Sequence, residues 1–427
     1  MLIPMEGKQL SPIRGRQVTQ RDSSSFAGEL RAFSEFQKAT QIERFPDPDI
    51  DLPVFINEFW TSKQRAASSL HEISYRACFK PQLPRFFISR LTNQGDIVYD
   101  PFMGRGTTPL EAGLMGRRPA GCDINPLSRF LLAPRLNPPT EEEVRDRLLS
   151  LPSASSDCSD HQDLQAFYHP KTLERIIALR CYLLDRQASG SIDPTDAWIR
   201  MVATNRLTGH SSGFFSAYTL PPNQAVSVES QRKINANRGQ TPPERDINAI
   251  IQKKTRTLLK KIDHSALRRL RNVSSSSILI TGSCDDTPEL ESDSIALVVT
   301  SPPFLDVVDY QKDNWLRCWF NGLDAASISI WQLKGVEGWM AAMTRVFTEL
   351  RRILIPGGHV AFEVGEVRGG KILMETLVVP AALEAGLHPK LILINNQVFT
   401  KTANCWGVSN STKGTNTNRI ILLQKED

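Results

Sequence analysis

Short apolar runs that alternate with helical patterns fall into two separate stretches of the chain. The first stretch predicts a strand at 96–100, a helix at about 107–115 and a second strand at 119–123, which together form a βαβ unit. The second stretch predicts strands separated by turns and helices, at 277–281, 294–300, 359–365, 391–399 and 419–425. Alternation of this kind indicates an α/β fold with a doubly wound, mostly parallel sheet.

The chain between the two stretches has a different pattern. Residues 127–272 are mainly helical, and we expect them to form an insertion into an α/β domain of residues 46–126 and 273–427. Before that domain, residues 1–45 are polar and predict a flexible N-terminal arm. Residues 58–77 have a helical pattern.

The composition excludes several classes of protein. With 427 residues, of which 40% are hydrophobic and 23% charged, the chain is ordinary globular protein. No run reaches the roughly 18 apolar residues that a membrane span needs, and the N-terminus lacks the apolar core of a signal peptide. We therefore expect a cytoplasmic protein without a membrane partner. The seven cysteines include no Cys-x-x-Cys pair, which favours neither a metal site nor a disulfide framework.

The positive charge is concentrated in one segment. The net charge of the chain is +5, whereas residues 231–271 alone contain twelve lysines and arginines against three acidic residues, a local charge of +9. Such a block suits a polyanionic partner, although a solvated helix face would give the same pattern. The overlapping residues 208–245 are rich in Gly, Ser, Pro and Asn, which predicts a long loop.

A glycine loop, "DPFMGRGTT", follows the first predicted strand. Gly104 and Gly106 allow the backbone to turn close to a ligand at a helix N-terminus, and the alternative is an ordinary tight turn. Asp123, about 20 residues later at the end of the next strand, can accept both hydroxyls of a ribose or can cap the following helix. Together, the loop and Asp123 favour a nucleoside ligand.

The run "VVTSPPF" ends a later strand at the same predicted edge of the sheet. Its prolines fix φ and prevent a helix. The Ser301 hydroxyl and the Pro302 carbonyl offer two acceptors, and Phe304 offers an aromatic face, so the run can bind a flat heterocycle through an exocyclic amine. A rigid strand exit is the alternative.

The two motifs together resemble those of the DNA amino-methyltransferases. In that family, Asp-Pro-Phe-x-Gly-x-Gly binds S-adenosylmethionine, and Asp/Asn/Ser-Pro-Pro-Tyr/Phe binds the target amine. The segment "ACFKPQLPRFFISRL" resembles the family's segment before the glycine loop. The resemblance implies a Rossmann-like methyltransferase domain with a helical insertion as the candidate DNA target-recognition region. It implies these cofactor-binding residues: Lys80, Pro81, Asp100, Pro101, Phe102, Gly104, Gly106, Thr107, Asp123 and Asp285.

The resemblance also implies the reaction. A base leaves its stack, Phe304 stacks on it, and the catalytic group of Ser301, Pro302, Pro303 and Phe304 orients the amine for transfer. Serine at the first position is typical of enzymes that methylate N4 of cytosine. N6 of adenine in DNA and base amines in RNA are the enzymatic alternatives, and a nucleic-acid-binding protein without activity is the non-enzymatic one. No Pro-Cys pair occurs, which argues against a covalent cysteine mechanism.

The implied partner is double-stranded DNA. The expected phosphate contacts are in the basic segment, at Arg232, Lys233, Lys253, Lys254 and Arg256. A restriction endonuclease is a candidate protein partner, and the implied location is cytoplasmic and nucleoid-associated, in a prokaryote or encoded by a phage.

Two departures from the family pattern stand out. Arg105 lies between the two glycines, where serine is usual, and Ser283 lies where many members have an acid, with Asp285 and Asp286 slightly later.

Overall fold

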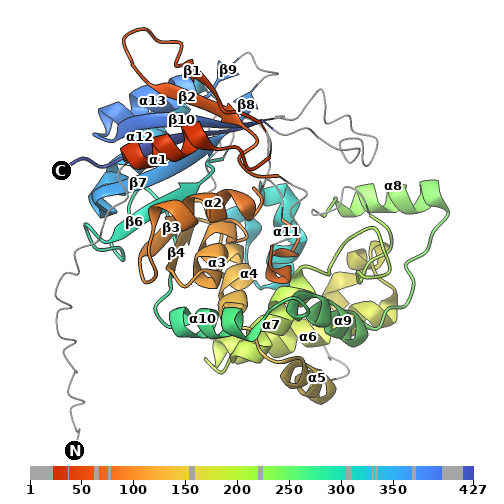
Figure 1. Ribbon diagram of the computed structural model, residues 1–427. Coiled ribbons are helices and arrows are strands. Elements are labelled where there is room, and N and C mark those ends of the chain that lie inside the picture. The colour runs from red at the N-terminus through yellow and green to blue at the C-terminus, as the bar shows by residue number, and fades with distance from the viewer. Residues whose placement is uncertain are drawn as a thin grey trace, which may run out of the picture.

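The structure is a computed structural model that describes residues 23–36, 38–61, 67–75, 78–152, 159–219, 225–303, 310–328, 331, 335–367, 372–396 and 417–427. A nine-stranded sheet forms its centre (Figure 1). The strands of this sheet are β1 (Gln41–Arg44), β2 (Pro53–Asn57), β3 (Ile97–Asp100), β4 (Arg118–Asp123), β5 (Ile278–Thr281), β6 (Ile295–Thr300), β7 (Leu354–Val364), β10 (His388–Asn396) and β11 (Thr417–Gln424). A separate antiparallel pair consists of β8 (Glu366–Val367) and β9 (Ile372–Leu373).

The strand order is β1-β2-β10-β11-β7-β6-β3-β4-β5. β11 is antiparallel to both of its neighbours and β1 is antiparallel to β2, whereas the other neighbouring pairs are parallel. From β3 the chain adds β4 and β5 on one side, and it then returns to add β6 and β7 on the other. The carboxyl ends of β3 and β6 therefore lie side by side at the reversal, where doubly wound sheets bind ligands. The predicted doubly wound, Rossmann-like fold is confirmed.

Alternating residues of the strands bury the two faces of the sheet. In β6, Leu297 and Val299 pack with α1 (Ser23–Ala32) and α2 (Gln82–Leu91) on one face. Val298 between them packs with α12 (Val336–Ile353) and α13 (Glu375–Glu384) on the other. This period of two, with apolar residues at every position, is characteristic of strands that are covered on both faces.

Between β4 and β5, the regular elements of the described residues are helices, which loops connect. They are α4 (Leu127–Leu136), α5 (Glu141–Ser150), η2 (Ser159–Ala166), α6 (Pro170–Ala188), α7 (Pro194–Thr204), α8 (Val228–Arg238), α9 (Ile247–Leu259) and α10 (His264–Ser274). They share a hydrophobic core with α3 (Thr107–Leu114) and α11 (Tyr310–Phe320), and Figure 1 shows most of them below the sheet. Among the described residues, no helix is long and apolar enough to cross a membrane.

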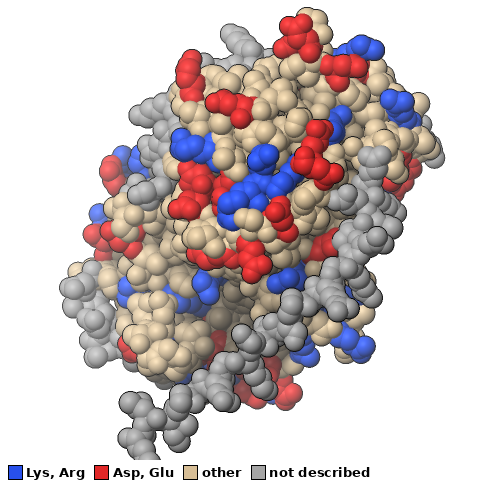
Figure 2. Space-filling model, turned by 90° about the vertical axis from the view of Figure 1, so that its left-hand side faces the viewer, with Lys and Arg blue, Asp and Glu red and all other residues tan. Residues whose placement is uncertain are grey.

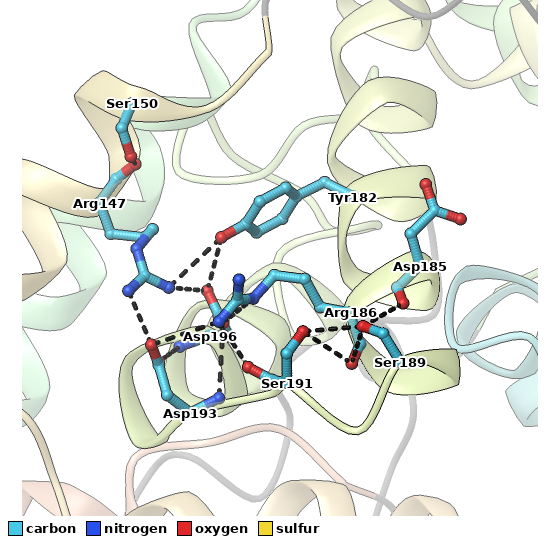
Figure 3. A network of polar contacts seen from close by, with 9 residues as sticks. All are labelled: Arg147, Ser150, Tyr182, Asp185, Arg186, Ser189, Ser191, Asp193 and Asp196. Carbon is cyan, nitrogen blue, oxygen red and sulfur yellow. Dashed lines mark hydrogen bonds and ion pairs between the residues drawn. The ribbon is translucent and has the colours of Figure 1, made fainter.

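A polar network fixes the junction of α5, α6 and α7 (Figure 3). Asp196 is fully buried and accepts hydrogen bonds from Arg147, from Tyr182 Oη at 3.1 Å and from Arg186 Nε at 2.5 Å. Asp193, the N-cap of α7, accepts from Arg147 Nη2 at 2.7 Å. The two arginines are therefore neutralised inside the insertion, since each pairs with a carboxylate.

The prediction of a flexible arm over 1–45 is wrong for residues 23–36 and 38–45. Phe26, Leu30 and Phe33 are buried against α2, with Phe33 just beyond the end of α1, and β1 pairs with β2 at the edge of the sheet. The polar composition of the arm concealed an apolar stripe with helical spacing. Residues 1–22 lie outside the described residues.

The helix expected at 58–77 is also wrong for the described part of that segment. The only regular element there is a single 3₁₀ turn, η1 (Ser69–His71). Phe59 and Trp60 are buried beside Phe86, with ring centroids 5.9 Å and 5.3 Å away, and the backbone N–H of each donates to Asn395 Oδ1. Packing of two adjacent aromatic residues against α2 and β10 overrides the helical pattern.

Candidate active site

A pocket of about 960 Å³, part of it open solvent, lies at the carboxyl ends of β3, β4, β5 and β6. Both predicted motifs line it. The lining residues are Tyr75, Cys78, Phe79, Asp100, Pro101, Phe102, Met103, Gly104, Thr107, Asp123, Ile124, Asn125, Gly282, Ser283, Cys284, Ser301, Pro302, Pro303 and Trp331. A concave site with an apolar wall and a few converging polar groups is the usual form of a small-ligand pocket.

The glycine loop turns sharply between β3 and α3. Gly104 and Gly106 have φ values of 49° and 76°, in the left-handed region that favours glycine. A Cβ on Gly106 would lie 2.7 Å from Leu132 Cδ1, so this glycine serves the close packing of the loop against α4. A Cβ on Gly104 would lie 3.5 Å from Tyr75 Cε1, on the pocket side. The loop backbone therefore forms part of the pocket wall at Gly104.

Asp123 connects the end of β4 to this loop. Its Oδ2 accepts from Gly104 N at 2.8 Å and its Oδ1 from Asn125 N at 2.8 Å. Burial raises the pKa of the Asp123 carboxyl, and the hydrogen bonds from these two backbone donors partly oppose that rise. Each oxygen accepts more than one hydrogen bond when ionised, so the pair can still take two hydroxyl donors from the pocket. These two acceptor positions match the two hydroxyl donors on the ribose of a nucleoside cofactor.

Asp100 closes the floor of the pocket between β3 and β6. It is 1% exposed, and its Oδ1 accepts from Phe102 N at 3.1 Å and from Thr300 Oγ1 at 2.6 Å. Burial raises the pKa of this carboxyl to about 7, despite these hydrogen bonds. Asp100 therefore changes its charge near neutral pH.

Replacing Asp100 with asparagine should change how stability depends on pH. Because the folded-state pKa lies above the ordinary value of 3.8, the folded protein retains a proton that the unfolded chain has lost. The resulting stabilisation is complete below about pH 4 and disappears as the pH rises through about 7. The parent should lose roughly 2–3 kcal/mol of unfolding free energy between pH 5 and pH 8. Asp100→Asn should not show this loss, because asparagine does not titrate. Denaturant unfolding at both pH values measures this, and equal pH dependence of the two proteins would contradict it.

Ser301 follows β6 at the other side of the pocket and donates a hydrogen bond to the carboxylate of Glu363 in β7. Glu363 is 7% exposed and also accepts from Asn418 Nδ2 at 2.7 Å through its Oε1. Burial raises the pKa of Glu363, and the two donors oppose that rise. A hydroxyl that donates to Glu363 keeps its oxygen lone pairs as acceptors.

The two prolines after Ser301 have different surroundings. Trp339 Nε1 in α12 donates to the Pro303 carbonyl at 3.3 Å, which fixes the strand exit. Within the described residues, the Pro302 carbonyl accepts no hydrogen bond. It therefore remains an acceptor on the pocket wall. Phe304 lies outside the described residues.

Several predicted cofactor residues do not line the pocket. Pro81 is the N-cap of α2, and the exposed Lys80 precedes it, so Cys78 and Phe79 take their place in the wall. Asp285 is not among the lining residues, and its carboxylate accepts from Arg345 Nε at 3.0 Å and from Ser283. Gly106 packs behind the loop. The remaining predicted cofactor residues do line it.

Arg105, the departure from the family pattern, has a structural role. Its Nη1 donates to the carbonyls of His71 and Ile73 at 3.4 Å and 2.9 Å, and its Nη2 to that of Phe79 at 3.4 Å. Arg105 therefore joins the glycine loop to the chain that carries Tyr75, Cys78 and Phe79. A serine side chain would be too short to make these contacts.

The residues predicted to bind DNA do not form one surface. Arg232 and Lys233 lie on α8, where they pair with Asp163 and Glu229, and Figure 1 shows α8 well apart from α9. On α9, Arg256 pairs with Glu141 and Lys253 is exposed. Lys254 is half-buried, and its Nζ donates to the Glu72 carbonyl at 2.5 Å.

Charges of both signs are also interspersed over the face that Figure 2 shows. Such a face attracts a polyanion less strongly than a continuous basic surface would.

Some pocket residues were not predicted from the sequence. Ile124 and Asn125 directly follow Asp123, and proximity to a predicted ligand contact is the signal that could have indicated them. Trp331 is distant along the chain, and its ring centroid lies 6.2 Å from that of Phe102. Glu363, a charged residue in the middle of the apolar run "HVAFEVG", was detectable as a polar exception in a buried strand.

Comparisons with known proteins agree with the motifs. The DNA methylase family model matches residues 36–128, which include the glycine loop and Asp123. The Type II methyltransferase M.BsoBI of Geobacillus stearothermophilus is 22% identical over 342 residues, which are 70% of this chain and 63% of the relative. The Type II methyltransferase M.MjaII of Methanocaldococcus jannaschii is 34% identical over 91 residues, 21% of this chain and 17% of the relative.

The chain thus spans less than two thirds of either relative's length. Among solved structures, TrmN from Thermus thermophilus is 12% identical, with a TM-score of 0.32, and the match covers 84% of this chain and 51% of that one. The sequence matches confirm the predicted resemblance to the DNA amino-methyltransferases and, with it, S-adenosylmethionine as the cofactor.

Proposed function

We propose, from this resemblance and the geometry of the pocket, that the chain methylates DNA at the exocyclic N4 amine of cytosine. The observation that supports the proposal best is that one pocket is lined by the glycine loop and Asp123 on one side and by Ser301 to Pro303 on the other. Cofactor-binding and amine-binding groups from distant parts of the sequence thus meet at the reversal of the sheet.

S-adenosylmethionine, when bound, supplies an electrophilic methyl group. Asp123 would accept hydrogen bonds from its ribose hydroxyls, and Phe102, Ile124 and Cys284 would provide apolar contact with its nucleoside. The Ser301 hydroxyl and the Pro302 carbonyl accept hydrogen bonds from the amine of the flipped base, which orients its lone pair for transfer. Phe304 is the proposed stacking partner of the base.

Glu363 is the residue proposed to receive the proton that the amine loses. The amine transfers a proton to Ser301 Oγ, and Ser301 transfers its own proton to the carboxylate. Because burial raises the pKa of Glu363, its carboxylate is a stronger base than an exposed one.

Glu363→Gln should therefore reduce kcat by roughly tenfold to a thousandfold. In the parent protein kcat should rise with pH as Glu363 ionises, and the variant should lose that limb of the profile. Single-turnover rates measured across pH give both readouts. A variant with slower transfer but an unchanged pH profile would show that Glu363 acts only in packing.

The decisive experiment is incubation with labelled S-adenosylmethionine and genomic DNA, followed by nucleoside analysis by mass spectrometry. N4-methylcytosine is the expected product. N6-methyladenine would show that the target base is adenine, with the same chemistry. Label found only in RNA would show that the substrate is RNA. Cofactor binding without any labelled base in DNA or RNA would contradict the enzymatic proposal. A restriction–modification role with a partner endonuclease is part of the same proposal and requires the DNA product.

A further inference from the structure

Three cations meet behind the chain that carries Tyr75 into the pocket. Arg206 follows α7, Lys254 is on α9 and Arg317 is on α11. We refer to them as the cation cluster. Arg206 and Lys254 are partly exposed, whereas Arg317 is 9% exposed.

The members of the cluster repel one another. Burial is the main cause that lowers the pKa of Lys254 to about 8, and the positive charge of Arg206 is the second. Burial, followed by Arg317, lowers the pKa of Arg206 to about 10. Glu72 partly offsets the effect on Lys254, as does Asp313 for Arg317. Like charges brought together at a partly dry site favour an added anion.

The contacts of the cluster are with neutral groups. Arg206 Nε donates to the Asn205 carbonyl at 2.8 Å, and its guanidinium lies 4.1 Å from the ring centroid of Phe214. Lys254 and Arg317 donate to the carbonyls of Glu72 and Ser74. Within the described residues, none of the three forms an ion pair. The arginines of the network in Figure 3, by contrast, are fully committed to Asp193 and Asp196.

The cluster is tied to the pocket through a short segment. Lys254 and Arg317 bind the backbone at Glu72 and Ser74, and Ser74 N donates to Asn205 Oδ1 at 2.8 Å. The next residue, Tyr75, lines the pocket. A nucleotide whose base enters the pocket leaves its phosphates outside the entrance, so a phosphate contact beside Tyr75 would fix the flipped strand.

We propose that Arg206, Lys254 and Arg317 bind a backbone phosphate of the DNA strand that carries the target base. The inference rests on the proposed function and adds a phosphate site to it. The site shares Lys254 with the expected phosphate contacts, whereas Arg232, Lys233 and Arg256 of that set form ion pairs.

The test uses the full chain and a mixed-sequence DNA duplex, with the dissociation constant measured between about 50 and 200 mM salt. In Arg206→Gln/Lys254→Gln, the slope of log affinity against log salt should fall by about 0.9, with binding at moderate salt roughly five- to tenfold weaker. Affinity for S-adenosylmethionine should stay unchanged, which shows that the pocket is intact. Lys260→Gln removes a charge from the exposed end of α9 and should leave the slope unaltered.

Two results would overturn the phosphate site. One is a parental salt slope in the double variant, and the other is an equal loss of slope in Lys260→Gln. Inorganic phosphate at matched ionic strength tests whether the anion is free phosphate instead of DNA. A site for free phosphate alone would raise the melting temperature of the parent, while the salt slope of DNA binding would be the same in the parent and the double variant. Methyl transfer by the parent chain is measured separately, so failure of the proposed function is recognised independently.

Discussion

Replacing Ser301 with alanine is expected to lower kcat by roughly a hundredfold or more, while the affinity for S-adenosylmethionine changes little. The substitution removes one of the two acceptors for the target amine and breaks the connection between the amine and Glu363. It leaves Asp123 and the glycine loop in place, and these form the cofactor side of the pocket. The effect should therefore fall on the transfer step.

Single-turnover methylation measures the effect on the transfer step, and equilibrium binding measures the effect on cofactor affinity. Ser294→Ala is a matched control, because it makes the same change at the opposite end of β6, where the hydroxyl donates to the Glu291 carbonyl. Thermal unfolding of both variants checks that the sheet is intact. Undiminished transfer in Ser301→Ala would remove Ser301 from the catalytic group, and loss of cofactor binding would place it on the cofactor side instead.

The sheet could be predicted from the sequence because its strands are buried on both faces. A short run that is apolar at every position, such as 294–300, fits a strand buried on both faces. The predicted boundaries of this run agree with those of β6 to within one residue. Strands β1 and β2 were missed because β2 pairs with β10, which is far along the chain, and β1 pairs in turn with β2. In 208–245 the polar composition gave no sign of α8, in which Gln231 is the one fully buried residue.

The pocket was predictable only where a motif specifies backbone geometry. The glycines and Asp123 have a fixed spacing that a nucleoside requires, and their arrangement follows from the β3–α3–β4 connection. Arg105 and Glu363 could not be assigned in this way, because their partners lie far along the chain and are brought close only by tertiary packing. The same holds for the cation cluster, whose members lie on α9, on α11 and just after α7.

Replacing Asp123 with alanine is expected to weaken S-adenosylmethionine binding by roughly two to four orders of magnitude. Two hydrogen bonds to a charged acceptor, each worth roughly 1.5–3 kcal/mol, would be lost with the carboxylate. The Gly104 N–H would also lose its acceptor, which loosens the pocket wall.

Asp123→Asn tests the assignment more finely, because it keeps the size of the side chain but replaces one acceptor with a donor. We expect its cofactor affinity to lie between those of the parent and Asp123→Ala. Asp96→Asn, at the opposite end of β3, is the control; there the carboxylate accepts from Asn93 N at the exposed edge of the sheet. Calorimetric titration with S-adenosylmethionine measures all four proteins. If Asp123→Ala is folded and binds the cofactor as tightly as the parent, then Asp123 serves only to cap the following turn, and the nucleoside must contact the pocket elsewhere.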